Sequence, residues 1–93
     1  MIERDGNRLR VTGALTFANA TALNAAARQH LNGDIVVDLA GVTEVDSAGL
    51  SVLFEWRRAA QQNNCRIAFR NLPESLQSLA ALYGVADLIA SNA

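Results

Sequence analysis

The chain of 93 residues has no lysine and only one cysteine. Without lysine it lacks both a Schiff-base amine and the phosphate-binding lysine of a P-loop, and no glycine-rich run suggests a nucleotide cradle. With Cys65 alone, neither an intrachain disulfide nor a cysteine-cluster metal site can form, and Cys65 is expected to be a small structural side chain. We therefore expect no nucleotide chemistry, no metal and a reducing compartment.

Strong charge and long apolar runs are also missing. The net charge is −1, the pI is about 5.7, and the eight basic residues are arginines spread from Arg4 to Arg70. This distribution offers no basic patch for nucleic acid or anionic lipid. Charged residues interrupt the apolar stretches well before the roughly 20 residues that cross a bilayer, and no signal-peptide pattern is present. We expect a cytoplasmic protein that neither inserts directly into a membrane nor binds nucleic acid.

Turn signals and hydrophobic periodicity predict the elements in order. Gly6-Asn7 separates two short strands, and Asn32-Gly33 ends an alanine-rich helix as a C-cap does. Pro73 comes where the first turn of a helix tolerates it. The expected elements are a hairpin of residues 2–5 and 9–12, a helix over 19–31, a strand over 35–39, a helix from 47 to about 63, a strand over 66–70, a helix with an apolar stripe of Leu76, Leu79, Ala80 and Tyr83 that ends at Gly84, and a short turn over 85–89.

This order predicts one domain over residues 1–93. Its 51% hydrophobic content is enough for a packed core, and the length leaves no room for a second domain. Strands that alternate with helices favour an α/β fold with a right-handed crossover from the strand at 35–39 to the strand at 66–70. We predict an N-terminal β-hairpin joined to a mixed sheet of about four strands, packed with three to four helices.

The segment from Asp46 to Gly49 joins an apolar strand to the longest predicted helix. Asp and Ser are favoured N-caps, so a plain structural role is available to Asp46 and Ser47. The free N–H groups and positive dipole end of a helix N-terminus would equally make a hydroxyl or phosphate on Ser47 important. Gly49 costs roughly 1 kcal/mol relative to alanine in a helix, which indicates close approach of backbone or of a partner.

The helix that starts at Ser47 is amphipathic. Phe54 lies about 20° from Ser47 on the helical wheel, so it is either a partner anchor or is buried beneath a neighbouring loop. Arg57 projects toward the apolar side, as the stem of a snorkelling arginine does. The narrow polar stripe contains Ser47, Ser51, Glu55, Arg58 and Gln62, and the opposite apolar side contains Gly49, Leu50, Leu53, Trp56 and Ala60.

Catalytic and metal chemistry have weak support in the residues. Ser47, His30 and Asp38 would have to converge to form a hydrolase triad, and no Gly-x-Ser-x-Gly elbow surrounds Ser47. His30 lies near a predicted helix C-terminus, where a structural role is expected. Asp38, Glu44 and Asp46 lack calcium-loop spacing and are expected to be solvated or capping residues.

The segments Val36–Leu39 and Val45–Leu50, followed by the long helix, closely resemble STAS domains, the module shared by sulphate transporters and anti-sigma factor antagonists. The signature is Asp-Ser-x-Gly-Leu after an apolar Asp-Leu strand, and the resemblance covers nearly the whole chain. The STAS order of hairpin, helix, strand, helix, strand and helix agrees with the order predicted above.

Within this family the chain is most similar to the small cytoplasmic STAS subunit of the Mla-type ABC system, which moves phospholipid between the membranes of Gram-negative bacteria. The similarity lies in the short hairpin, the segment 13–17 before the first helix and the ending 79–85. It implies binding to the ABC ATPase subunit through the surface around Ser47, in support of outer-membrane lipid asymmetry. That partner would hold the chain at the inner membrane. The position of Ser47 is often threonine in this branch.

The chain is next most similar to anti-sigma factor antagonists. In those proteins the residue aligned with Ser47 accepts phosphate from an anti-sigma factor kinase, and phosphorylation prevents the antagonist from sequestering that kinase. Phosphate would add about −1.5 to −2 charges to a surface that a partner must cover. This alternative makes Ser47 a candidate phosphoacceptor.

Both branches lead to the hypothesis of a non-catalytic protein-binding module that uses no cofactor and no small-molecule ligand. A negative charge at Ser47 is expected to weaken the complex, whereas Ser47→Ala removes little beyond a cap. Gly49 is expected to be structural. The partner-binding surface is predicted to comprise Asp46, Ser47, Ser51, Phe54, Glu55 and Arg58.

Overall fold

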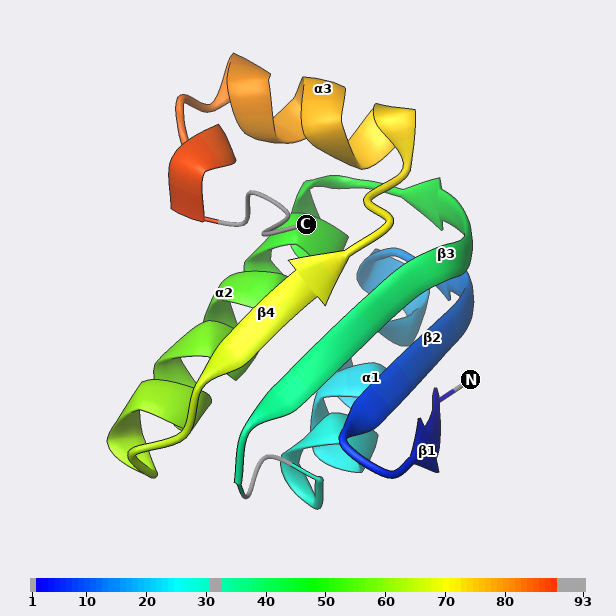
Figure 1. Ribbon diagram of the computed structural model, residues 1–93. Helices are drawn as coiled ribbons and strands as arrows, with labels where there is room; N and C mark the ends of the chain where they lie inside the picture. The colour runs from blue at the N-terminus through cyan, green and yellow to red at the C-terminus, as the bar shows by residue number, and fades with distance from the viewer. Residues whose placement is uncertain (1, 31–32, 89–93) are drawn as a thin grey trace.

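The computed structural model describes residues 2–30 and 33–88, and its elements alternate between strands and helices (Figure 1). The predicted order is confirmed, and the short final turn is a 3₁₀ helix. In chain order the elements are β1 (Ile2–Asp5), β2 (Arg8–Leu15), α1 (Phe17–Arg28), β3 (Ile35–Val45), α2 (Ser47–Gln62), β4 (Ile67–Arg70), α3 (Glu74–Leu82) and η1 (Ala86–Leu88).

The four strands form one mixed sheet in the order β1-β2-β3-β4, as predicted. β1 and β2 are antiparallel and meet at a turn in which Gly6 has a φ of 62°, a conformation that glycine adopts at low cost. β2, β3 and β4 are parallel, so each parallel pair needs a crossover. α1 supplies the first crossover and α2 supplies the second.

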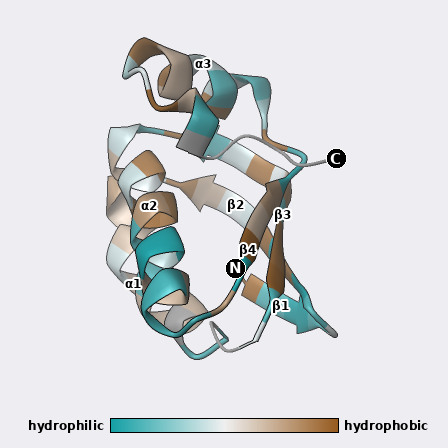
Figure 2. Cartoon of the chain, turned by 60° about the vertical axis from the view of Figure 1, so that its left-hand side comes forward, coloured by the Kyte–Doolittle hydropathy of each residue, from teal (hydrophilic) through white to brown (hydrophobic). Residues whose placement is uncertain are grey.

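Helices α1 and α2 lie side by side on one face of the sheet, and α3 lies across the end where the parallel strands finish (Figure 2). Strand alternation divides the residues between the two faces: Leu9 and Val11 of β2 are buried under the helices, whereas Arg8 and Arg10 are exposed. The largest fully buried side chains are Trp56, Leu9, Leu15, Leu39, Leu53, Leu76, Val11 and Val37. The predicted apolar side of α2 thus faces the core.

Strands β2 and β3 are longer than the sequence pattern predicts. β3 continues six residues past the expected end at Leu39 and stops only at Val45, next to the start of α2. The β2–β3 register shifts between Arg10 and Thr12 and again between Gly13 and Ala14. Such irregularities break the alternation of buried and exposed residues on which strand prediction depends. Only Asp46 therefore separates the end of β3 at Val45 from the start of α2 at Ser47.

The predicted helix boundaries need three corrections. α1 begins at Phe17 rather than at Asn19 and ends at Arg28, and its predicted end at residue 31 and the Asn32 part of its cap lie outside the described residues. Pro73 is the N-cap residue just before α3, not part of its first turn. Ile89, the predicted last residue of the final turn, also lies outside the described residues.

Tyr83 was placed on the apolar stripe of α3, and this placement is wrong. Leu76 and Ala80 are buried and Leu79 is half-buried, but Tyr83 is 57% exposed. Tyr83 is the C-cap residue, and Gly84 follows it with a φ of 70°. The chain leaves the helical path at Gly84, directly after Tyr83, so no further helical turn follows to hold the Tyr83 ring against the core. In the described part of the chain, no helix combines the length and apolar character needed to cross a bilayer.

Candidate functional site at the start of helix α2

Asp46 connects the first turns of α1 and α2. Its Oδ1 accepts a hydrogen bond from Gly49 N, and its Oδ2 accepts one from Phe17 N, each at 3.0 Å. These bonds, first the one from Phe17 and then the one from Gly49, lower the pKa of the Asp46 carboxyl. Asp46 N also donates to Leu15 O at 3.3 Å. The capping role of Asp46 is therefore confirmed, and it serves two helices.

Gly49 lies against the backbone of β2. A Cβ atom built on Gly49 would overlap the carbonyl oxygen of Leu15 and would lie 2.7 Å from its carbonyl carbon. Because backbone atoms at the end of a strand cannot move aside cheaply, only glycine fits there. Of the two alternatives for Gly49, close approach of the chain's own backbone is the one that the structure shows.

The polar row of α2 lies on its outer surface. Ser47, Ser51, Arg58 and Gln62 are exposed, and Glu55 is half-buried. Ser51 Oγ donates to Ser47 O at 3.1 Å, and Glu55 Oε1 and Arg58 Nη1 are 3.2 Å apart. Within the described residues, the Ser47 hydroxyl has no hydrogen-bond partner. It is therefore free to bind another molecule.

Phe54 is half-buried beside the segment that follows α3. It packs against the core and lines a shallow hollow of about 290 Å³, here named the Ser47 hollow. This half-buried position agrees with packing beneath a neighbouring segment, and the role of Phe54 as a partner anchor stays a prediction. The residues of the Ser47 hollow are Ser47, Leu50, Ser51, Phe54, Tyr83 and Val85.

A second hollow of about 300 Å³ lies between α1 and α2 and is here named the Asn24 hollow. The Asn24 Oδ1 atom is buried, and no group among residues 2–30 and 33–88 donates a hydrogen bond to it. Ser51 belongs to both hollows, so the row from Ser47 to Ser51 is a ridge between them. The Asn24 hollow is lined by Ala20, Thr21, Asn24, Ala48, Ser51, Val52 and Glu55.

Residues of α1 and of the end of α3 also belong to this surface, and they were not predicted from the sequence. Phe17, at the first position of α1, is 80% exposed, and Leu82, at the end of α3, is 77% exposed. The sequence does contain a signal for the exposure of Phe17. On a helical wheel of α1, Phe17 lies about 120° from the buried Leu23 and therefore outside the buried face. For Tyr83, which lines the Ser47 hollow, helical periodicity wrongly predicted a place on the buried apolar stripe of α3.

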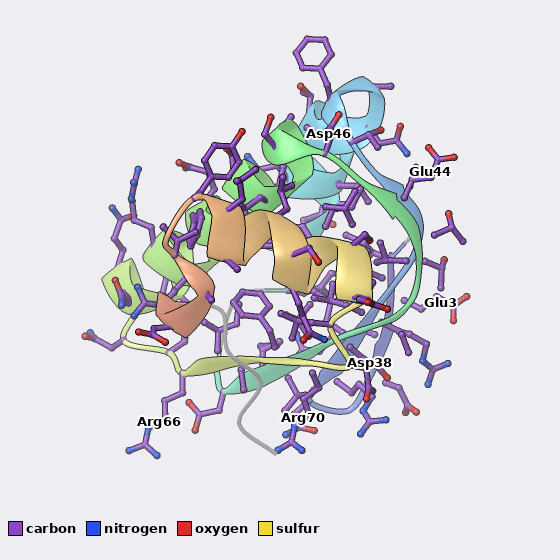
Figure 3. All side chains as sticks on the ribbon, turned by 90° about the horizontal axis from the view of Figure 1, so that it is seen from above. Glu3, Asp38, Glu44, Asp46, Arg66 and Arg70 are labelled. Carbon is purple, nitrogen blue, oxygen red and sulfur yellow. The ribbon has the colours of Figure 1, made fainter. Side chains whose placement is uncertain are left out.

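The other sequence candidates do not join this site. His30 follows α1, and its carbonyl oxygen accepts from Arg4 Nη1 at 3.0 Å, which places it beside the hairpin rather than at the start of α2. Figure 3 shows Asp38 well away from Asp46 and Glu44. The hydrolase triad therefore does not form. Across residues 2–30 and 33–88, no group of three acids, histidines or cysteines could hold a metal ion.

Asp38 instead connects β3 with β2 and with the segment that follows β4. It is 7% exposed, and its Oδ1 accepts from Asn71 Nδ2 and from Ala40 N, both at 3.0 Å. Its Oδ2 lies 3.6 Å from Arg8 Nη1 on β2. The bond from Asn71, followed by the one from Ala40, lowers the pKa of the Asp38 carboxyl. Asp38 is a structural carboxylate.

Solved structures with a similar fold include bacterial regulators and a transporter-family protein. Unphosphorylated SpoIIAA, an anti-sigma factor antagonist, is 13% identical, with a TM-score of 0.77 over 100% of this chain and 87% of that chain. Phosphorylated SpoIIAA, a Bacillus cell fate determinant, is 13% identical, with a TM-score of 0.72 over 100% and 90%. A sulfate transporter family protein from Wolinella succinogenes is 13% identical, with a TM-score of 0.71 over 90% and 70%. These likenesses show a shared fold.

Sequence comparison assigns the family. No curated protein matches the chain significantly. A family model described as "Mlab, STAS domain" matches residues 1–90, which is nearly the whole chain. The strand, cap and helix geometry at Asp46 and Gly49 lies within this match. The chain therefore belongs to the STAS domain family.

Proposed function

We propose that this chain is the non-catalytic STAS subunit of a bacterial Mla-type ABC system for phospholipid transport. In this role it binds the ATPase subunit, supports its assembly and activity, and so contributes to outer-membrane lipid asymmetry. The observation that carries the proposal is the match of residues 1–90 to the "Mlab, STAS domain" family model. The ATPase would hold the chain at the cytoplasmic face of the inner membrane.

The surface around Ser47 suits a protein contact. Its Ser47 hydroxyl is exposed and has no partner in the described residues, while the Asp46 carboxylate is already bonded to two backbone amides. Glu55 and Arg58 neutralise each other. A partner can therefore cover the α2 start without burying an unpaired charge, which would cost several kcal/mol. The helix start is also held rigidly, so little conformational entropy is lost on binding.

The central test is a titration of the ATPase subunit with the full chain and its variants. Ser47→Glu is expected to weaken binding by at least about tenfold, because it places an unpaired carboxylate in the contact. Ser47→Ala is expected to change affinity by no more than about threefold, because it removes one hydroxyl from a largely apolar contact. Stimulation of ATP hydrolysis by the chain is expected to fall in parallel with affinity.

Ser75→Glu is the matched control. Ser75, like Ser47, is an exposed serine in the first turn of a helix, but it lies on α3. Its replacement adds the same charge outside the proposed contact, so affinity is expected to remain that of the wild type. Equal affinity of the wild type and Ser47→Glu for the ATPase would rule out this surface as the contact.

A second candidate function has support from the free Ser47 hydroxyl. We propose as the alternative an anti-sigma factor antagonist that is regulated by phosphorylation of Ser47, because a free, exposed hydroxyl is accessible to a kinase. A similar fold occurs in both the phosphorylated and unphosphorylated forms of SpoIIAA. Incubation with an anti-sigma factor kinase and ATP is then expected to add one phosphate by intact mass, and Ser47→Ala to abolish it. Absence of labelling would count against this alternative.

A further inference from the structure

Exposed apolar side chains surround Ser47 on two sides. In the part of the chain that the structure describes, the large hydrophobic residues with exposed side chains are Phe17, Leu82 and Tyr83. Phe17 is fixed beside the start of α2 by the bond from its amide to Asp46. Tyr83 lies on the opposite side, because it lines the Ser47 hollow, and Leu82 precedes it. Apolar groups of this size, gathered around one point, are typical of binding surfaces.

Two rows of side chains organise the surface between these residues. On α1, Phe17, Thr21 and Asn24 follow one another at helical spacing, and on α2 the ridge runs from Ser47 to Ser51. The Asn24 hollow separates the two rows, and the Ser47 hollow lies on the far side of the ridge. A ridge with a hollow on either side matches the ridges-into-grooves surface on which a second helix packs.

The chemistry of the surface limits what can cover it. Charged groups near the ridge are satisfied internally: Asp46 binds the two amides and Glu55 pairs with Arg58. The floor of the Asn24 hollow is made largely of small side chains, which allow close helix approach. The complementary partner is therefore apolar and uncharged at its centre.

We propose that the partner covers Ser47 with one amphipathic helix that straddles the ridge from Ser47 to Ser51. One apolar row of the partner helix fills the Asn24 hollow and the next row fills the Ser47 hollow. Phe17 and Tyr83 contact the partner helix from opposite sides. This inference rests on the proposed function, since it names the kind of ATPase segment that binds, and it extends the contact from α2 to α1 and α3.

Long side chains in the hollow provide the sharpest test. Thr21 and Ala22 are neighbouring exposed residues on α1, but only Thr21 lines the Asn24 hollow. Thr21→Arg is expected to weaken binding to the ATPase subunit by at least about tenfold, because it fills the space that an apolar row needs. Ala22→Arg carries the same charge and bulk outside the contact and is expected to bind within about twofold of the wild type.

The aromatic anchors are tested in the same titration. Phe17→Ser and Tyr83→Ser are each expected to weaken binding by roughly tenfold, as truncated hot-spot residues do. Both side chains are more than half exposed, so thermal melts are expected to show folded variants. Wild-type binding by Thr21→Arg, Phe17→Ser and Tyr83→Ser, with loss of binding by Ser47→Glu, would overturn this inference and leave the proposed function standing.

Two further outcomes distinguish the proposed helix contact from a failure of the proposed function and from self-association of the chain through the same surface. If wild-type protein does not bind the ATPase at all, the proposed function and this inference both fail. If the free chain self-associates in analytical ultracentrifugation and Thr21→Arg makes it monomeric, a second copy covers the surface and the inference is overturned. A monomeric free chain with binding lost in Thr21→Arg and kept in Ala22→Arg supports the helix-straddling contact.

Discussion

At the scale of single residues, Gly49 decides how closely α2 can approach the sheet. Side chains and backbone in a protein interior are close-packed, so an added methyl group needs a neighbour that can move. At Gly49 the neighbour is the Leu15 carbonyl group, which is fixed at the end of β2. The small size of this residue therefore positions Ser47, which lies one half-turn earlier in the same helix.

Gly49→Ala is expected to destabilise the fold by about 2–3 kcal/mol. The overlap with Leu15 outweighs the gain of roughly 1 kcal/mol in helix propensity. Gly41→Ala is a comparison variant, because a Cβ there would meet the Thr12 side chain, which can rotate, at 2.6 Å. Its cost is expected to be smaller. Urea unfolding measures both, and a Gly49→Ala variant as stable as the wild type would contradict the packing argument.

At the scale of elements, one carboxylate joins two helices. α1 has no side-chain cap of its own from Thr16, so Asp46 supplies its capping oxygen across a separation of 29 residues. The same carboxylate caps α2 through Gly49 N. Capping two helix starts with one group fixes Phe17 relative to Ser47, and with them the proposed contact surface.

Asp46→Asn is expected to lower the melting temperature and loosen one helix start. An Asn side chain has one acceptor oxygen, so either the Phe17 amide or the Gly49 amide loses its partner. Hydrogen exchange at these two amides is expected to speed up in the variant. Asp34→Asn is the matched control, since the bond from Arg66 N to Asp34 Oδ1 needs one oxygen, which Asn retains. Equal melting temperatures for the two variants would argue against the double cap.

At the scale of the whole molecule, two carboxylates hold opposite parts of the structure. Asp46 joins the helices at the proposed contact, and Asp38 joins β2, β3 and the segment after β4 through Arg8 and Asn71. In both, hydrogen bonding lowers the pKa below the ordinary value of 3.8. Both groups therefore bind fewer protons in the folded state than in the unfolded chain as the pH approaches that value.

Stability is therefore expected to fall as the pH is lowered below about 4. A carboxyl group with a depressed folded-state pKa stabilises the fold fully above its unfolded pKa, and this contribution is lost as the pH falls through the folded pKa. Urea midpoints measured from about pH 7 to pH 3 test this. Asp38→Asn cannot titrate at this position and is expected to show a shallower acid limb. A wild-type midpoint that rises between about pH 5 and pH 3 would contradict the assignment.

Most of the element order, and the face of α2 that points toward the core, could be predicted from the sequence alone. Leu53 and Trp56 recur at helical spacing, and Asp46 precedes the helix as an N-cap does. These are local signals, because helical periodicity and capping depend on neighbours within about one turn. The full lengths of β2 and β3 were not predicted, because the irregularities in their pairing disturb the two-residue alternation of buried and exposed side chains.

Only the tertiary structure decided what surrounds Ser47. Phe17 reaches it because Asp46 caps α1 across the fold, and Tyr83 reaches it because the chain leaves α3 at Gly84. Gly49 was ambiguous in the sequence until its contact with Leu15 was visible. Each of these facts depends on residues far apart in the chain, and no local period records such a pairing. The sequence alone determined which helix face is polar, and packing determined which side chains stand beside it.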